Sequence, residues 1–95
     1  MIIYGVMVRG YSSENYFDLI LDVRNTSEWL DGNYPNSLNI PIKYLKKYKN
    51  NDKKIKILIY YKNFNGSKKA YKILTKNGFK NVLFFENKYN KLLSP

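Results

Sequence analysis

The sequence contains no cysteine and no histidine among its 95 residues. The missing cysteines exclude disulfide bonds and a thiolate nucleophile. The missing histidines remove the side chain that most often acts as a base at neutral pH. Nothing in the remaining residues indicates a metal site, and we predict that the chain uses no cofactor.

Long hydrophobic runs are absent as well. No apolar stretch approaches the ~20 residues that a membrane span needs. The first ten residues, MIIYGVMVRG, also lack the basic segment and the long apolar core of a secretory signal. We therefore expect a cytoplasmic protein with no membrane partner.

Arginine is scarce although the chain is basic. The formal charge is +10, and only two of the 17 cations are arginines. A charge of this size attracts nucleic acid or acidic protein, but arginine is the better reader of phosphates and bases. We favour the interpretation that most lysines form a solvated surface, and we keep weak nucleic-acid binding as an alternative.

What is present indicates one folded α/β domain over residues 1–95. A hydrophobic fraction of 44% and an aromatic fraction of 17% are too high for a disordered chain. Short apolar, β-rich runs alternate with short helical segments, which favours a sheet with parallel strands. We expect strands at Met1–Arg9 (an edge strand), Leu19–Val23, Ser37–Ile40, Ile55–Tyr60 and Asn81–Phe85, and helical segments at Ser27–Asp31, Tyr44–Tyr48, Ser67–Lys76 and Tyr89–Leu93.

The central stretch Ile55–Ala70 organises this pattern. Ile55–Tyr60 is a nearly continuous apolar run, interrupted only by Lys56, which is typical of a strand buried on both faces of a parallel sheet. A turn then leads to a helix that we expect to start at Ser67, with Ser67 or Asn65 as its N-cap. A strand, a short loop and a helix N-terminus point several backbone N–H groups at one place, which favours an anion there.

Two charged side chains follow the strand at Leu19–Val23. Asp22 and Arg24 lie at its carboxyl end, and Tyr61 follows the next long strand. Because crevices in such sheets lie beyond the carboxyl ends of the strands, Asp22–Arg24 and Tyr61–Ser67 should be neighbours in space.

The order of these pieces resembles the rhodanese-like domain family over roughly Leu19 to Leu93. No single motif is decisive, but several similar segments occur in the family's order. These are Asp22-Val23-Arg24, the pair Glu28-Trp29, the turn Gly32–Ser37, the ending Asn39-Ile40-Pro41 and the segment KNGFKNVLFFEN from Lys76 to Asn87.

The resemblance implies a three-layer α/β/α domain with a mainly parallel sheet of about five strands. It also implies a sulfurtransferase site in a six-residue loop that a cysteine opens. Here Tyr61 falls at that cysteine, Phe64 at the loop glycine and Gly66 at the loop arginine, while Ser67 matches. A phenol cannot carry a persulfide and is a poor nucleophile at neutral pH, so we predict no catalytic residue. Phe64 would be strained if its position required a positive φ.

The candidate ligand site is the segment after the central strand. Tyr61 either contacts a ligand through its ring and hydroxyl or fills the pocket that the cysteine left, and we favour the second. The resemblance assigns Asp22, Arg24 and Glu28 to structural support of the loop. The candidates for contact with an anion or ligand are Tyr61, Lys62, Asn63, Phe64, Asn65, Gly66 and Ser67.

Three functional hypotheses follow. The leading one is a non-catalytic rhodanese-like binding or regulatory module whose partner is a protein or a small anion. The second is an enzyme: either one of the sulfurtransferase class that acts with a thiol supplied by a partner, or one with a different chemistry for which Asp22, Tyr61 and Lys62 are the titratable candidates. The third is a basic domain that binds nucleic acid weakly through phosphates.

Overall fold

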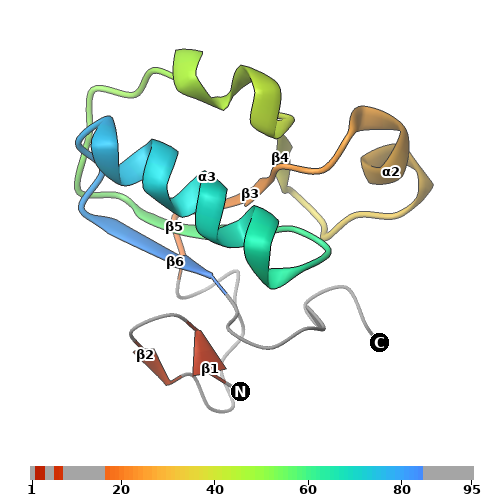
Figure 1. Ribbon diagram of the computed structural model, residues 1–95, viewed down its shortest axis with the longest axis horizontal. Coiled ribbons are helices and arrows are strands. Elements are labelled where there is room, and N and C mark those ends of the chain that lie inside the picture. Colours follow the sequence, from red (N-terminus) through yellow and green to blue (C-terminus); the bar gives the residue numbers. More distant parts are fainter. Residues whose placement is uncertain (1, 4–5, 8–16, 85–95) are drawn as a thin grey trace.

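A parallel sheet of four strands forms the centre of the molecule. The computed structural model describes residues 2–3, 6–7 and 17–84 (Figure 1). The strands are β3 (Leu19–Asp22), β4 (Leu38–Asn39), β5 (Lys56–Tyr60) and β6 (Asn81–Phe84). They lie in the order β4-β3-β5-β6, and every pair is parallel. The predicted α/β class with a parallel sheet is therefore confirmed.

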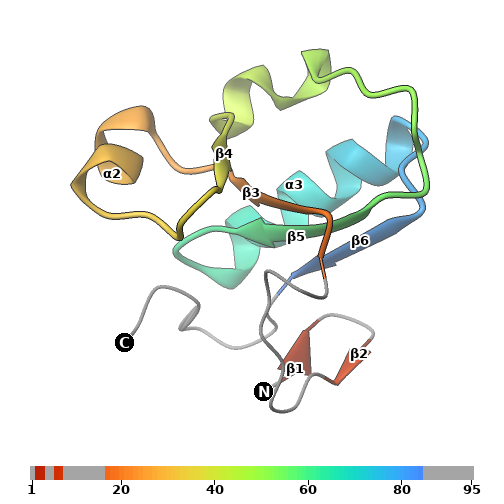
Figure 2. The same ribbon diagram turned by 180° about the vertical axis from the view of Figure 1, so that it is seen from behind.

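One face of this sheet is covered by two helices that lie side by side. They are the 3₁₀-helix η1 (Ile42–Lys47) and the α-helix α3 (Phe64–Lys76), as both ribbon views show (Figures 1 and 2). Alternate strand residues point toward them because side chains alternate between the faces of a strand. The buried cluster on this face comprises Leu21, Val23, Leu45, Ile57, Ile59, Ala70, Leu74, Phe79, Val82 and Phe84.

The remaining strand residues, which alternate with those just listed, point to the opposite face of the sheet. Ile20 and Leu58 are buried there with Phe17, and Tyr34 packs against them. Leu58 in β5 and its neighbours Ile57 and Ile59 are all fully buried. The central strand is thus covered on both faces at Ile57–Ile59, as its nearly continuous apolar run predicts.

The N-terminal stretch does not form the predicted edge strand. Its described residues form two short strands, β1 (Ile2–Ile3) and β2 (Val6–Met7), which pair antiparallel with each other. The described parallel sheet accordingly has four strands instead of about five. The helical turn predicted at 89–93 lies outside the described residues.

The helix α3 starts three residues before the predicted Ser67. Its N-cap is Asn63, whose side-chain oxygen Oδ1 accepts a hydrogen bond from the N–H of Gly66 at 2.9 Å. Asn63 precedes the two predicted caps, Asn65 and Ser67, in the chain. Phe64–Gly66 therefore belong to the first turn of the helix. Phe64 therefore has a helical backbone, and among the described non-glycine residues only Asn36 has a positive φ.

The short helix α2 (Thr26–Asp31) follows β3 and lies beyond the carboxyl ends of the strands (Figure 2). Asn25 is its N-cap and Gly32 its C-cap, so the helix begins one residue before the predicted Ser27. Glu28 completes a capping box, because its carboxylate accepts a hydrogen bond from the N–H of Asn25 at 3.3 Å.

Candidate functional site

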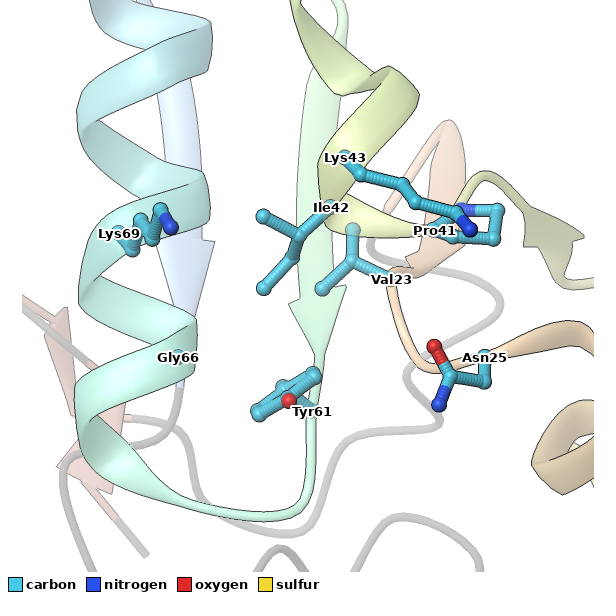
Figure 3. Close-up of a pocket in the computed structure, with 8 residues that line it drawn as sticks. All are labelled: Val23, Asn25, Pro41, Ile42, Lys43, Tyr61, Gly66 and Lys69. Atoms are coloured by element: carbon cyan, nitrogen blue, oxygen red, sulfur yellow. The ribbon is translucent and has the colours of Figure 1, made fainter.

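Tyr61 lies at the carboxyl edge of the sheet, directly after β5. Its half-buried ring rests against Gly66 in the first turn of α3 (Figure 3). A Cβ atom on Gly66 would overlap the ring atoms Cδ2 and Cε2 of Tyr61. The tyrosine ring can occupy this place only because residue 66 has no side chain.

The first turn of α3 uses part of its own hydrogen-bonding capacity. Besides the Asn63–Gly66 bond, the N–H and the Oγ of Ser67 both donate to the carbonyl oxygen of Asn63, at 3.2 Å and 3.0 Å. The Phe64 ring points into the core, where its centroid lies 5.7 Å from that of Phe84. Two of the N–H groups expected to face an anion are thus bonded within the turn.

Asp22 and Arg24 form the most buried ion pair of the described residues. The Asp22 side chain is 1% exposed and that of Arg24 is 12% exposed. Arg24 Nη2 donates to Asp22 Oδ2 at 2.8 Å, and its backbone N–H donates to Oδ1 at 2.9 Å. The hydrogen bond to Asp22 raises the pKa of Arg24.

Arg24 also fastens the surroundings of this pair. Its Nη2 donates to the carbonyl oxygen of Gly32 at 2.7 Å, which holds the end of α2. On the other side, the guanidinium carbon lies 4.9 Å from the centroid of the Tyr60 ring, the last residue of β5. Arg24 thereby joins β3, α2 and β5 just below Tyr61.

Glu28 reaches the segment after β5 through Lys62. The Lys62 Nζ donates to Glu28 Oε2 at 3.2 Å, and both side chains are partly exposed. The hydrogen bond from Lys62 lowers the pKa of Glu28. This contact places Glu28 beside the candidate loop, where the resemblance expects a supporting residue.

Asn39 supports the same corner and was not predicted to do so. Its Nδ2 donates to the carbonyl oxygens of Asp22 and Arg24 at 3.1 and 3.0 Å, and its Oδ1 accepts from the Thr26 hydroxyl at 2.8 Å. Since β4 pairs parallel with β3, its last residue reaches the same sheet edge. That topology is the signal that could have identified Asn39.

A cavity of about 330 Å³ opens beside Tyr61 (Figure 3). Its apolar part comes from Val23, Ile42 and Pro41, and two lysines line it from opposite sides, Lys43 on η1 and Lys69 on α3. The Tyr61 ring lies between Gly66 on α3 and Asn25 (Figure 3). The lining residues are Val23, Asn25, Pro41, Ile42, Lys43, Tyr61, Gly66 and Lys69.

The sequence-predicted site residues are only partly brought together at this cavity. Tyr61 and Gly66 line it, whereas Lys62 turns to Glu28 and Phe64 points into the core. Asn63 and Ser67 are engaged in the cap, and Asn65 is exposed. Sequence reasoning missed Lys43, whose position two residues after Pro41 at the sheet's carboxyl edge could have indicated it, and treated Lys69 only as part of an exposed helix face.

The described part of the chain holds no group of three or more acidic side chains that could bind a metal ion. In the same residues, no helix has both the length and the apolar character that a membrane crossing requires. The chemistry available at the cavity is therefore that of a phenol, an amide and two ammonium groups beside an apolar wall.

Comparison with known proteins assigns the fold. The family model for the rhodanese-like domain matches residues 9–94, and the chain belongs to this family. No curated protein sequence matches it significantly. Together with the absence of cysteine from the chain, this makes it a rhodanese-like domain without the family's sulfur-carrying residue.

Solved structures agree with this assignment. A rhodanese-like domain from Anabaena sp. is 27% identical, with a TM-score of 0.67 over 73% of this chain and 82% of that chain. A rhodanese with anions from E. coli is 25% identical, with a TM-score of 0.62 over 67% of this chain and 79% of that one. A human single-domain sulfurtransferase shares the fold at 14% identity, with a TM-score of 0.68 over 83% of this chain and 82% of the human chain.

Proposed function

We propose that this chain is a non-catalytic rhodanese-like module that binds a small anionic ligand at the cavity beside Tyr61. The observation that carries the proposal is the contact between the Tyr61 ring and Gly66. The resemblance places the family's cysteine at Tyr61 and its loop arginine at Gly66. The Tyr61 ring occupies the space that the family's cysteine and arginine side chains would take. The site then has no sulfur carrier, and the adjoining cavity is available for binding.

The chemistry of the cavity supports an anion as the ligand. Lys43 and Lys69 contribute positive charge from two sides, while Asn25 and the Tyr61 hydroxyl add polar atoms. Val23 and Ile42 supply an apolar wall for the uncharged part of a ligand. The similar E. coli rhodanese was solved with anions, which is consistent with an anion-binding tendency of this fold.

Sulfur transfer from thiosulfate to cyanide tests the non-catalytic half of the proposal. The natural chain should show no transfer above the blank. Tyr61→Cys alone should remain close to the blank, because position 66 still lacks the arginine. Tyr61→Cys/Gly66→Arg should exceed Tyr61→Cys, with Tyr61→Ser/Gly66→Arg as the control without a thiol. Transfer by the natural chain would refute the proposal.

Titration with thiosulfate, followed by backbone NMR shifts, tests the binding half. Shifts should concentrate on the residues around the cavity, including Gly66 and Lys69. Lys43→Gln/Lys69→Gln should weaken binding at least ten-fold, whereas the control Lys54→Gln/Lys68→Gln should change it less than two-fold. Equal weakening by both double variants would show only diffuse attraction to a basic surface.

A further inference from the structure

The two helices on one face of the sheet carry charge of one sign only. η1 and α3 together contain seven lysines and no aspartate or glutamate. The acidic residues of the described part, Asp18, Asp22, Glu28, Asp31 and Asp52, all lie outside these two helices. A lysine-rich but otherwise ordinary surface helix gains stability from alternating charges at i,i+4, and neither helix has any such pair.

The lysines of this face line both ends of the junction between η1 and α3. At one end, Lys43 and Lys69 border the cavity beside Tyr61, with Ile42 between the helices. At the other end, a second cavity of about 310 Å³ is bordered by Lys46, Ile73, Lys76 and Asn77. Asn77 Nδ2 donates to the carbonyl oxygen of Lys46 at 3.3 Å, which ties the two helix ends together there.

Both cavities are lined by residues of η1 and α3 at the junction between these helices. We call this junction the lysine groove and define it by Ile42, Lys43, Lys46, Lys69, Ile73 and Lys76. Both helices run in the same direction along it (Figure 1). Lys43 and Lys46 are one turn apart on a 3₁₀-helix, about 6 Å along its axis. Lys69 and Lys76 are two turns apart on an α-helix, about 10 Å along its axis. Each end of the groove thus has one lysine from each helix.

We propose that the lysine groove binds a single-stranded nucleic acid through its phosphates, without reading sequence. Steps of about 6 and 10 Å span roughly two to three nucleotides of a stacked strand that keeps the duplex rise of about 3.4 Å per nucleotide, and fewer of an extended strand. Lysine supplies point charges that suit phosphate but offers no bidentate contact to bases. This inference goes beyond the proposed ligand at Tyr61 and does not depend on it.

An exposed aromatic ring beside the groove favours nucleic acid over an acidic peptide. Tyr44 on η1 is 53% exposed, and the Lys43 Nζ lies 5.1 Å from its ring centroid. Proteins that bind single strands combine a basic track with aromatic rings on which bases stack. An acidic peptide would use the charges of the groove and have no use for this ring.

Fluorescence anisotropy with labelled oligothymidylate tests the inference. Binding at low salt should weaken as salt rises, with a log–log slope of about −3 if the four lysines each neutralise one phosphate at ~0.7 per contact. Lys46→Glu/Lys76→Glu should weaken binding at least ten-fold, and Tyr44→Ala should weaken it several-fold. Lys46→Gln/Lys76→Gln, the milder change, should lower the magnitude of the slope by about 1.4.

The matched control is Lys54→Glu/Lys68→Glu, which lowers the net charge from +10 to the same +6. Lys54 and Lys68 are exposed and border neither cavity. We expect this control to weaken binding less than three-fold. Equal loss in both double variants, no binding at low salt, or equally tight binding of polyglutamate that ignores Tyr44→Ala would each overturn the inference. None of these outcomes bears on sulfur transfer or on thiosulfate binding beside Tyr61.

Discussion

Two neighbouring corners at the carboxyl edge of the sheet have diverged to very different degrees. The corner after β3 keeps Asp22, Arg24 and Glu28 of the family pattern in a dense set of hydrogen bonds. In the corner after β5, the resemblance aligns Tyr61 with the family's cysteine and Gly66 with its loop arginine, and these two residues are in contact. The acidic and basic residues of the family pattern are thus present beside a corner that has no cysteine.

The comparison indicates that the supporting corner holds the fold together independently of sulfur transfer. Arg24 joins three elements, and Asn39 bonds to the backbone on both sides of Val23. These contacts satisfy buried polar groups, whose loss is costly in any folded protein. The contact between Tyr61 and Gly66, in contrast, is a van der Waals contact between a ring and a residue without a side chain.

Removing the Asp22 carboxylate should have the largest effect. Asp22→Ala leaves the nearly buried Arg24 without its partner, and breaking a buried pair costs about 3 kcal/mol or more. Urea unfolding should show this loss. Asp31→Ala, which removes an exposed carboxylate of α2, should change the free energy of unfolding by less than ~0.5 kcal/mol. Similar losses in both variants would mean that the buried ion pair contributes no more to the free energy of unfolding than an exposed carboxylate does.

The contact between Tyr61 and Gly66 predicts a change of sign between two backgrounds. In a helix, Gly→Ala is normally stabilising by about 1 kcal/mol. Here Gly66→Ala should instead destabilise the chain by about 1 kcal/mol, because the new Cβ displaces the Tyr61 ring. In the Tyr61→Ala background the same substitution should be stabilising. Gly66→Ala that stabilises the natural chain would show that the ring moves aside freely.

The strands and the supporting corner could be predicted from sequence because their signals are local. The apolar runs of β3 and β5 are set by residues adjacent in the chain. The rule that parallel strands end at one edge also predicts that Asp22 and Tyr61 are neighbours. Position 22 indeed pairs with Tyr60, the residue just before Tyr61.

The candidate site could be predicted only in outline because it depends on choices between equivalent local signals. Asn63, Asn65 and Ser67 are all acceptable N-caps, and the helix begins after the first of them. The cavity depends on the approach of η1 to α3, which brings Lys43 opposite Lys69 across a long sequence separation. No local pattern records that approach.

The N-cap of α3 sharpens this point with a smaller effect. Asn63→Ala removes the acceptor for the Gly66 N–H and should cost about 1 kcal/mol. Asn63→Asp keeps the acceptor and adds a negative charge at the helix N-terminus, so it should retain stability. Amide hydrogen exchange at Gly66 would report the same order. Equal stability of all three chains would indicate that the helix starts at another residue.

The Glu28–Lys62 salt bridge, which connects the two corners, should make the smallest contribution to the free energy of unfolding. The pKa of Glu28 is lowered in the folded chain by the hydrogen bond from Lys62. The stabilisation is therefore present above the ordinary glutamate pKa of about 4.3 and is lost as the pH falls through the lower folded value. Because both groups are exposed, we expect no more than ~0.5 kcal/mol, and less at high salt.

Comparison of Glu28→Gln with the natural chain at pH 7 and pH 3 isolates this bridge. The difference in free energy of unfolding should be measurable at pH 7 and should shrink toward pH 3, as the natural carboxylate becomes protonated. Lys62→Met should remove the same difference, while Lys68→Met, on the outer face of α3, should leave it intact. A difference that persists at pH 3 would assign the role of Glu28 to its capping bond with Asn25, and the two corners would then be energetically independent.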